Sequence, residues 1–201
     1  MKMRLFVVAA LLLALANPLD ATADIPVVLP LTLHIAERAG VPVVDDAFIT
    51  ARVARANEIF APYDVQFTVT SRVALEERHA AMASRADRDA LGEYFTRGTI
   101  HVFLVESLLD VDQPDRVRRG VHWLSATCRG AHYVILSSIA GVSVLAHELG
   151  HYLGNPQHSD DPGNLMSYQH TEVLPFLDTA QIGRLRRRLR QYLTTKELVP
   201  R

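Results

Sequence analysis

Two histidines in an apolar stretch constrain this chain more than any other feature. His147 and His151 stand four residues apart in V-S-V-L-A-H-E-L-G-H-Y-L, whose apolar spacing predicts a helix. Residues at this spacing lie one turn apart on the same helix face, so both imidazoles can bind one metal ion. Glu148 projects about 100° round the helix from His147, where it can reach a water on the metal without becoming a ligand. We therefore expect a metal centre, with zinc as its ion.

A third ligand requires the chain to turn back after His151, and the sequence contains a suitable turn. Gly154 can adopt the left-handed conformation that ends a helix, and Pro156 cannot easily extend one. The returning chain then offers His158. Three nitrogen ligands with one open position are typical of a catalytic zinc site, whereas structural sites close the fourth position, usually with cysteine. Cys128 is the single cysteine of the chain, so a catalytic site is the expectation.

Residues 147–168 resemble the metzincin clan of zinc metallopeptidases, whose pattern is H-E-x-x-H-x-x-G-x-x-H followed by a methionine turn. The pattern places its last histidine at Gln157, and we interpret the histidine at 158 as the result of a one-residue insertion in the turn. The spacing from His158 to Met166 is that of matrix-metalloproteinase-like members, so the resemblance implies Met166 as an apolar floor beneath the zinc. Tyr168 matches the tyrosine that astacin-like and serralysin-like members bring to the metal or to the reaction intermediate.

The resemblance implies an α+β fold of the zincin or metzincin type. Such a fold has a twisted mixed β-sheet with the active-site helix, and a small lower subdomain with the methionine turn and a C-terminal helix. The implied activity is that of a secreted zinc endopeptidase. Metal-activated water attacks the peptide bond with Glu148 as general base, and Tyr168 is the second catalytic residue. The implied metal ligands are His147, His151 and His158, and the implied structural residues of the site are Gly154 and Met166.

Two alternatives stay open. A secreted binding module could keep the zinc site for its shape and recognise a partner without turnover. A site with two histidines could instead take a downstream carboxylate as third ligand, with Asp160, Asp161 or Glu172 as candidates. Taken alone, Met166 would be a core residue and Tyr168 a half-buried aromatic residue. Their joint spacing after the histidines favours the catalytic interpretation.

The N-terminal residues predict export. Lys2 and Arg4 precede an apolar run from Leu5 to Ala16, and Ala21-Thr22-Ala23 is a cleavage site of small residues. We therefore interpret residues 1–23 as a signal peptide and expect the protein in the periplasm or outside the cell. No later stretch approaches the ~20 continuous apolar residues of a membrane span, so we expect no stable membrane insertion after cleavage.

The remaining residues are enough for one domain with a sizeable core. We predict a single catalytic domain over residues 24–197 and set apart residues 198–201, L-V-P-R, which resemble part of a thrombin-cleavable linker. A formal net charge of -1 gives no indication of nucleic-acid binding. The expected partner is a protein or peptide bound extended in the cleft along an edge strand at residues 121–127, and we expect a monomer.

The chain before the metal motif predicts a strand, a helix and a second strand. Residues 27–36 form the first strand, where Pro30 suggests a sheet edge or a bulge. A helix capped by Asp45 or Asp46 runs to about Phe60, and the alternating residues 65–69 favour a strand parallel to the first. Residues 74–97 include a helix whose ends the sequence does not define. Further strands are expected at residues 99–105, 121–124 and 132–138, and a last helix is expected from Asp178 or Thr179. His101, His122 and His132 lie on or beside these strands, and we assign structural roles to them.

Overall fold

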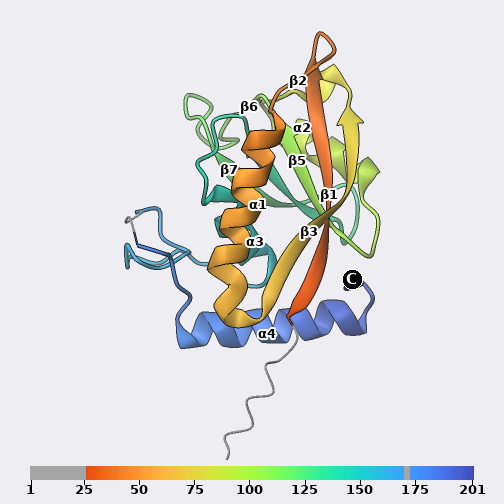
Figure 1. Ribbon diagram of the computed structural model, residues 1–201. Helices are drawn as coiled ribbons and strands as arrows, with labels where there is room; N and C mark the ends of the chain where they lie inside the picture. Colours follow the sequence, from red (N-terminus) through yellow and green to blue (C-terminus); the bar gives the residue numbers. More distant parts are fainter. Residues whose placement is uncertain (1–25, 170–172) are drawn as a thin grey trace, which may run out of the picture.

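A twisted mixed β-sheet forms the centre of the molecule, and helices lie on both of its faces (Figure 1). The computed structural model describes residues 26–169 and 173–201. The six-stranded sheet has the order β2-β1-β5-β8-β7, with β3 also paired to β1. The β1–β3, β1–β5 and β5–β8 pairs are parallel, whereas β2 and β7 are antiparallel to their neighbours. The strands are β1 (Val27–Arg38), β2 (Val41–Pro42), β3 (Val65–Leu75), β5 (Ile100–Val105), β7 (Gly120–Leu124) and β8 (His132–Ser137).

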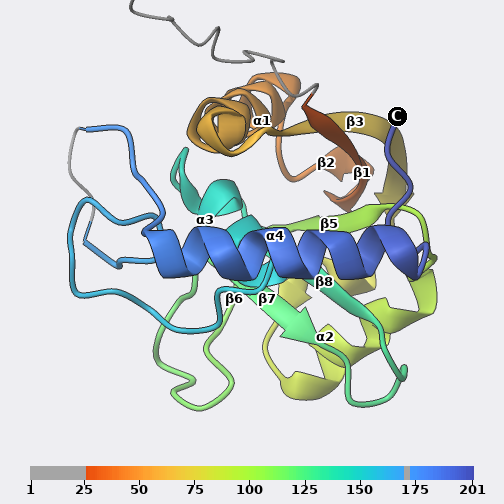
Figure 2. The ribbon, with the colours of Figure 1, turned by 90° about the horizontal axis from the view of Figure 1, so that it is seen from below.

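The helices divide the core into two parts. One face of the sheet packs against α1 and α3, and the shorter elements around α2 cover the other face (Figure 2). β1 contributes Leu29, Leu31 and Leu33 to the first part, where they share a core with residues of α1, α3 and α4. The remaining elements are α1 (Asp46–Phe60), α2 (Arg85–Ala90), α3 (Val144–Tyr152), α4 (Thr179–Thr194), η1 (Ala61–Tyr63), η2 (Glu77–His79), η3 (Leu91–Tyr94), and the small parallel pair β4 (Ala81–Met82) and β6 (Ser107–Leu108).

The predicted opening of strand, helix and parallel strand is confirmed. Asp45 is the N-cap of α1, because its Oδ1 accepts the backbone N–H of Phe48 at 2.7 Å. Pro30 lies where only one side of β1 is paired: it faces Thr68 of β3, whereas the pairing with β5 begins at Leu31. A bulge also lies close by. The pairing shifts register between Leu31 and Thr32, and the extra residue is Thr70 of β3, whose hydroxyl donates to the Leu31 carbonyl.

The helix predicted within residues 74–97 is confirmed: it is α2, begun by a capping box at Ser84. The end of β3, η2 and β4 precede it, and η3 follows it. Residues 198–201, which we set apart in the sequence, pack against the domain. Leu198 is 1% exposed within the first core, and the Val199 N–H donates to the Gly98 carbonyl at 3.1 Å. Burial of an apolar side chain holds this tail on the domain.

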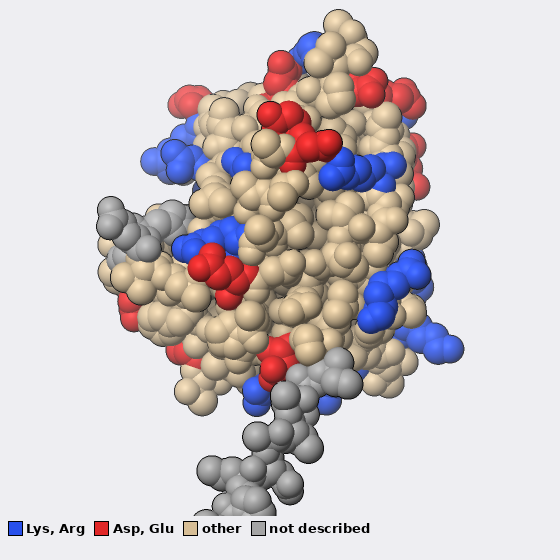
Figure 3. Space-filling model, in the orientation of Figure 1, with Lys and Arg blue, Asp and Glu red and all other residues tan. Residues whose placement is uncertain are grey.

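The C-terminal helix α4 crosses beneath the sheet (Figure 1). It starts at a capping box formed by Asp178 and Gln181, and it buries Leu185 and Leu189 in the core. Within the described residues, every helix falls short of the length and apolar character that crossing a membrane requires. The predicted signal peptide, residues 1–23, lies outside the described residues. On the face formed by α1 and β3, acidic and basic side chains lie in small separate groups (Figure 3).

Candidate metal centre

Three histidines from two segments meet at one point. α3 places His147 and His151 one turn apart, with ring centroids 4.8 Å apart and rings nearly perpendicular at 85°. The loop after α3 brings His158 to the same place, so one ligand nitrogen from each residue lies within 4.8 Å of the others. The Nε2 atoms of His151 and His158 are 3.2 Å apart. Two nitrogens bound to one tetrahedral zinc are separated by roughly 3.3 Å, so this distance fits a shared zinc ion.

The hydrogen bonds of the two helical histidines also fit a metal. Nδ1 of His147 lies 2.8 Å from the Leu165 carbonyl, and Nδ1 of His151 lies 2.7 Å from the Asn155 carbonyl. A carbonyl can only accept, so each Nδ1 carries the proton and donates it. Each Nε2 then carries the lone pair that a zinc ligand needs, and the carbonyls fix the orientation of the rings. This donor set and its outer contacts suit zinc.

The turn that returns the chain is held by α4. Gly154 has φ +99°, the left-handed conformation expected there. The fully buried Asn155 donates its N–H to the Gly150 carbonyl at 3.1 Å, and its Oδ1 accepts from Nε of Arg184 at 3.0 Å. The structure therefore accommodates the extra residue of this segment in an ordered turn, and it brings the histidine at 158 to the cluster.

Met166 packs directly beneath α3. It is fully buried, and a Cβ added to Gly150 would lie only 2.5 Å from its sulfur. The backbone N–H of Met166 donates to Oδ1 of Asn164 at 2.9 Å, which fixes the turn below the histidines. The role of Met166 as an apolar floor beneath the zinc stays a prediction. The need for glycine at position 150 was missed, because only the close approach of Met166 makes it visible.

Glu148 is buried beside the cluster. It is 6% exposed, and burial raises its pKa to about 8, while the backbone of His122 and the charge of Arg118 act in the opposite direction. The edge strand β7 can come this close because position 120 is glycine: a Cβ there would lie 3.0 Å from the Glu148 carboxylate. The sequence analysis did not identify Gly120, since nothing in its local pattern indicates a contact with α3.

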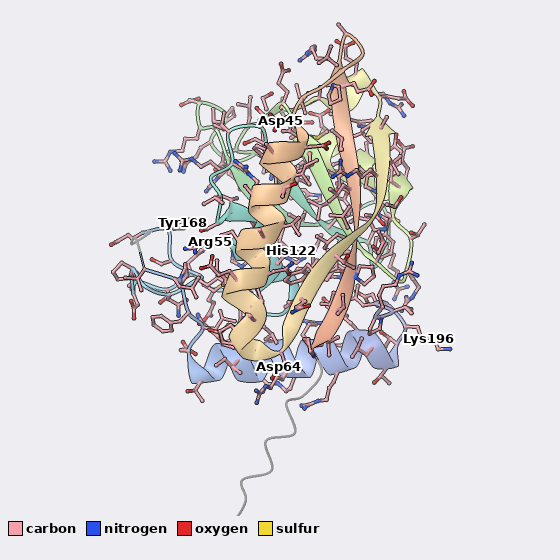
Figure 4. All side chains as sticks on the ribbon, in the orientation of Figure 1. Asp45, Arg55, Asp64, His122, Tyr168 and Lys196 are labelled. Atoms are coloured by element: carbon pink, nitrogen blue, oxygen red, sulfur yellow. The ribbon has the colours of Figure 1, made fainter. Side chains whose placement is uncertain are left out.

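Tyr168 lies at the margin of this site. Its ring stacks on the imidazole of His158 with centroids 4.0 Å apart, and 65% of the residue is exposed. Figure 4 places Tyr168 on the loop at the side of the molecule. The contact with His158 brings Tyr168 to the cluster, and its catalytic role stays a prediction.

A cavity of about 900 Å³ opens from the histidine cluster and extends along β7 and α3 to α4. β7 is the last strand of the sheet and is antiparallel to β8, as expected for residues 121–124. His122 and His132, to which we assigned structural roles, line this cavity and are hydrogen-bonded to each other at 3.0 Å. His132 also contacts the Glu197 carboxylate at 2.6 Å. These contacts join β7 and β8 to the C-terminal segment.

Comparisons with known proteins identify the fold. No family model matches the sequence, and a search of curated proteins finds no match. Among solved structures, archaemetzincin from Methanopyrus kandleri is similar with a TM-score of 0.51 and 22% identity, covering 81% of this chain and 96% of that chain. Metalloproteinase-II from Bacteroides fragilis has a TM-score of 0.54 and 17% identity over 81% of this chain and 53% of its own. Mirolysin in complex with compound 9 has a TM-score of 0.58 and 12% identity, covering 87% of this chain and 99% of that chain.

The chain has a zinc metallopeptidase fold. At identities this low the likeness concerns the fold alone, and it confirms the predicted α+β class with its mixed sheet and C-terminal helix. Within this metallopeptidase fold, the three-histidine cluster includes neither Asp160 nor Asp161. Glu172, the third carboxylate considered as a ligand, lies outside the described residues.

Proposed function

We propose that this protein is a secreted zinc-dependent endopeptidase. The observation that carries the proposal is the buried carboxylate of Glu148 beside three histidines whose geometry suits zinc. The metallopeptidase fold supports it independently. Secretion rests on the pattern of residues 1–23 alone. The protein acts as a monomer in this proposal.

In the proposed mechanism His147, His151 and His158 hold the metal. When bound there, zinc acts as a Lewis acid that lowers the pKa of a water and polarises the scissile carbonyl. Glu148 takes the proton of the attacking water and passes it to the leaving amine. The substrate is a peptide lying extended along the outer edge of β7, where its backbone can pair with the strand. Tyr168 hydrogen-bonds the oxygen that becomes negatively charged.

Replacement of Glu148 tests the mechanism. Glu148→Gln is expected to keep one zinc per chain and to lose nearly all hydrolysis, because the amide cannot accept the proton. Metal analysis and turnover of a quenched peptide library measure both quantities on the same sample. His158→Ala is the matched control for metal binding, and it should lose zinc together with activity. A Glu148→Gln protein that cleaves peptides at the parental rate would falsify the proposal, as would parental turnover that survives complete removal of zinc by a chelator.

A further inference from the structure

A cationic side chain that the mechanism above does not use lies in the same cavity. Arg118 stands two residues before β7, at the end of the loop that follows β6. It is half-buried, whereas its neighbour Arg119 is exposed. Together with Glu148, His158 and Tyr168, Arg118 lines the cavity that contains the histidine cluster. A charged group in such a place needs a partner or a function.

A buried carboxylate holds the guanidinium in place. Asp110 is 4% exposed, and its Oδ2 accepts from Nε of Arg118 at 2.6 Å and from Nη2 at 2.5 Å. The other oxygen of Asp110 accepts the backbone N–H groups of Asp112 at 2.8 Å and Gln113 at 3.1 Å. The backbone of Arg118 is held too, since its N–H donates to the Leu108 carbonyl at 2.7 Å. The ion pair thus orients the guanidinium, which carries five N–H donors in all.

Arg118 lies next to the groups at the candidate metal centre. Its guanidinium interacts with the Tyr168 hydroxyl, and the Tyr168 ring stacks on the imidazole of His158 with centroids 4.0 Å apart. Glu148 and His158 line the same cavity, so the guanidinium lies on the cavity side of the site. Hydrogen-bond donors that are fixed in a partly dry cavity stabilise developing negative charge better than mobile water does.

We propose that Arg118 is a catalytic residue that donates hydrogen bonds to the scissile carbonyl oxygen as that oxygen becomes anionic. The inference rests on the proposed peptidase function. No bond to Arg118 forms or breaks, and it keeps its proton throughout. Its contact with the oxygen strengthens as the negative charge develops, so it accelerates the reaction and contributes little to substrate binding. The ion pair with Asp110 orients the guanidinium for this contact.

Substitution at position 118 separates this role from a purely structural one. Arg118→Met is expected to lower kcat about 100-fold with KM changed by no more than a few-fold and with zinc content unchanged. Arg118→Lys should keep part of the rate, since it retains the charge without the paired donors. Arg119→Met removes the same charge from the adjacent exposed position and should leave kcat unchanged. Added guanidinium should partly restore kcat to Arg118→Ala, which loss of structure alone would not allow.

A binding measurement makes the inference testable without turnover. Zinc-loaded parent and Arg118→Met proteins are titrated calorimetrically with a phosphinic peptide, which mimics the tetrahedral anion, and with the matching unreactive peptide. The variant should lose at least about tenfold more affinity for the phosphinate than for the plain peptide. Equal losses for both ligands, or an unchanged kcat, would overturn the assignment. If the parent cleaves no peptide yet the phosphinate preference depends on Arg118, the peptidase proposal fails and the anion-stabilising role of Arg118 stands.

Discussion

Gly150 shows how one missing side chain shapes the candidate site. Alanine at this position would place its Cβ 2.5 Å from the Met166 sulfur, closer than real Cβ atoms approach. Gly150→Ala should therefore lower the free energy of unfolding by about 1–3 kcal/mol, since α3 and the methionine turn must move apart. Thermal or urea unfolding of the zinc-free protein measures the change.

The control for this substitution is another helical glycine. Gly183 in α4 has only a flexible arginine side chain near its added Cβ, at 3.6 Å. Gly183→Ala should therefore stabilise the protein, by up to about 1 kcal/mol, because glycine in a helix costs backbone entropy. Equal effects of the two substitutions would contradict the steric explanation for position 150.

The sequence predicted those site residues whose spacing along the chain determines where they lie. His147, Glu148 and His151 follow from helical periodicity, and the turn at Gly154 follows from glycine chemistry. Gly120 and Arg118 were missed for a physical reason. Gly120 approaches Glu148 and Arg118 interacts with Tyr168, both far along the chain, and local sequence patterns carry no information about such contacts.

At the scale of elements, a buried pair of amides joins the methionine turn to α4. Asn164 Nδ2 donates to Gln181 Oε1 at 2.8 Å, and Gln181 Nε2 donates back to Asn164 Oδ1 at 3.0 Å. The same two oxygens also accept the backbone N–H groups of Met166 and Asp178. The pair thus connects the floor of the metal site to the start of the last helix, at exposures of only 3% for each residue.

Breaking this pair should destabilise the protein and loosen the methionine turn. Gln181→Ala leaves the buried Asn164 amide without its partner, and we expect a loss of about 1–3 kcal/mol in the free energy of unfolding. Gln191→Ala, an exposed position on the same helix, should change stability by less than about 0.5 kcal/mol. A double-mutant cycle with Asn164→Ala isolates the coupling, and strict additivity of the two losses would contradict a direct link.

Elements were predicted well where periodicity and caps agreed. α1, α4 and the parallel strands β1 and β3 each have a clear apolar pattern or a capping aspartate. Within residues 74–97 the sequence did not define the ends of the helix, because alanines and charges suit a helix throughout, while the contacts of the second core restrict it to the 6 residues of α2 between short turns. His79 illustrates the effect of these contacts: its neighbours in the sequence are highly charged, yet the residue itself is only 4% exposed.

Across the whole molecule, the two faces of the sheet differ in their chemistry. The histidine cluster of the candidate metal centre lies on the side of α3, whereas the opposite face buries the pair of His34 and His101 next to Phe103. His34 Nε2 and His101 Nδ1 are 2.8 Å apart, and Nε2 of His101 lies 3.0 Å from both the backbone nitrogen and the carbonyl oxygen of Thr96. Nδ1 of His34 is buried and has no hydrogen-bond partner among the described residues.

This pair should make the stability of the protein fall in acid. Burial is the larger cause, and the charge of His101 the smaller one, that lowers the pKa of His34 from 6.5 to about 4. Between these two pH values the unfolded chain therefore binds more protons than the folded chain. The free energy of unfolding must therefore decrease as the pH drops from about 6.5 towards 4, by roughly 2–3 kcal/mol at pH about 4.5. His34→Gln keeps a side chain that can hydrogen-bond to His101 and removes the titration, so the stability of the variant should depend less on pH by that amount. Urea unfolding of both proteins at pH 7.5 and 4.5, with a chelator present so that metal binding contributes to neither, measures the difference. Identical pH dependence in the two proteins would show that acid acts elsewhere in the molecule.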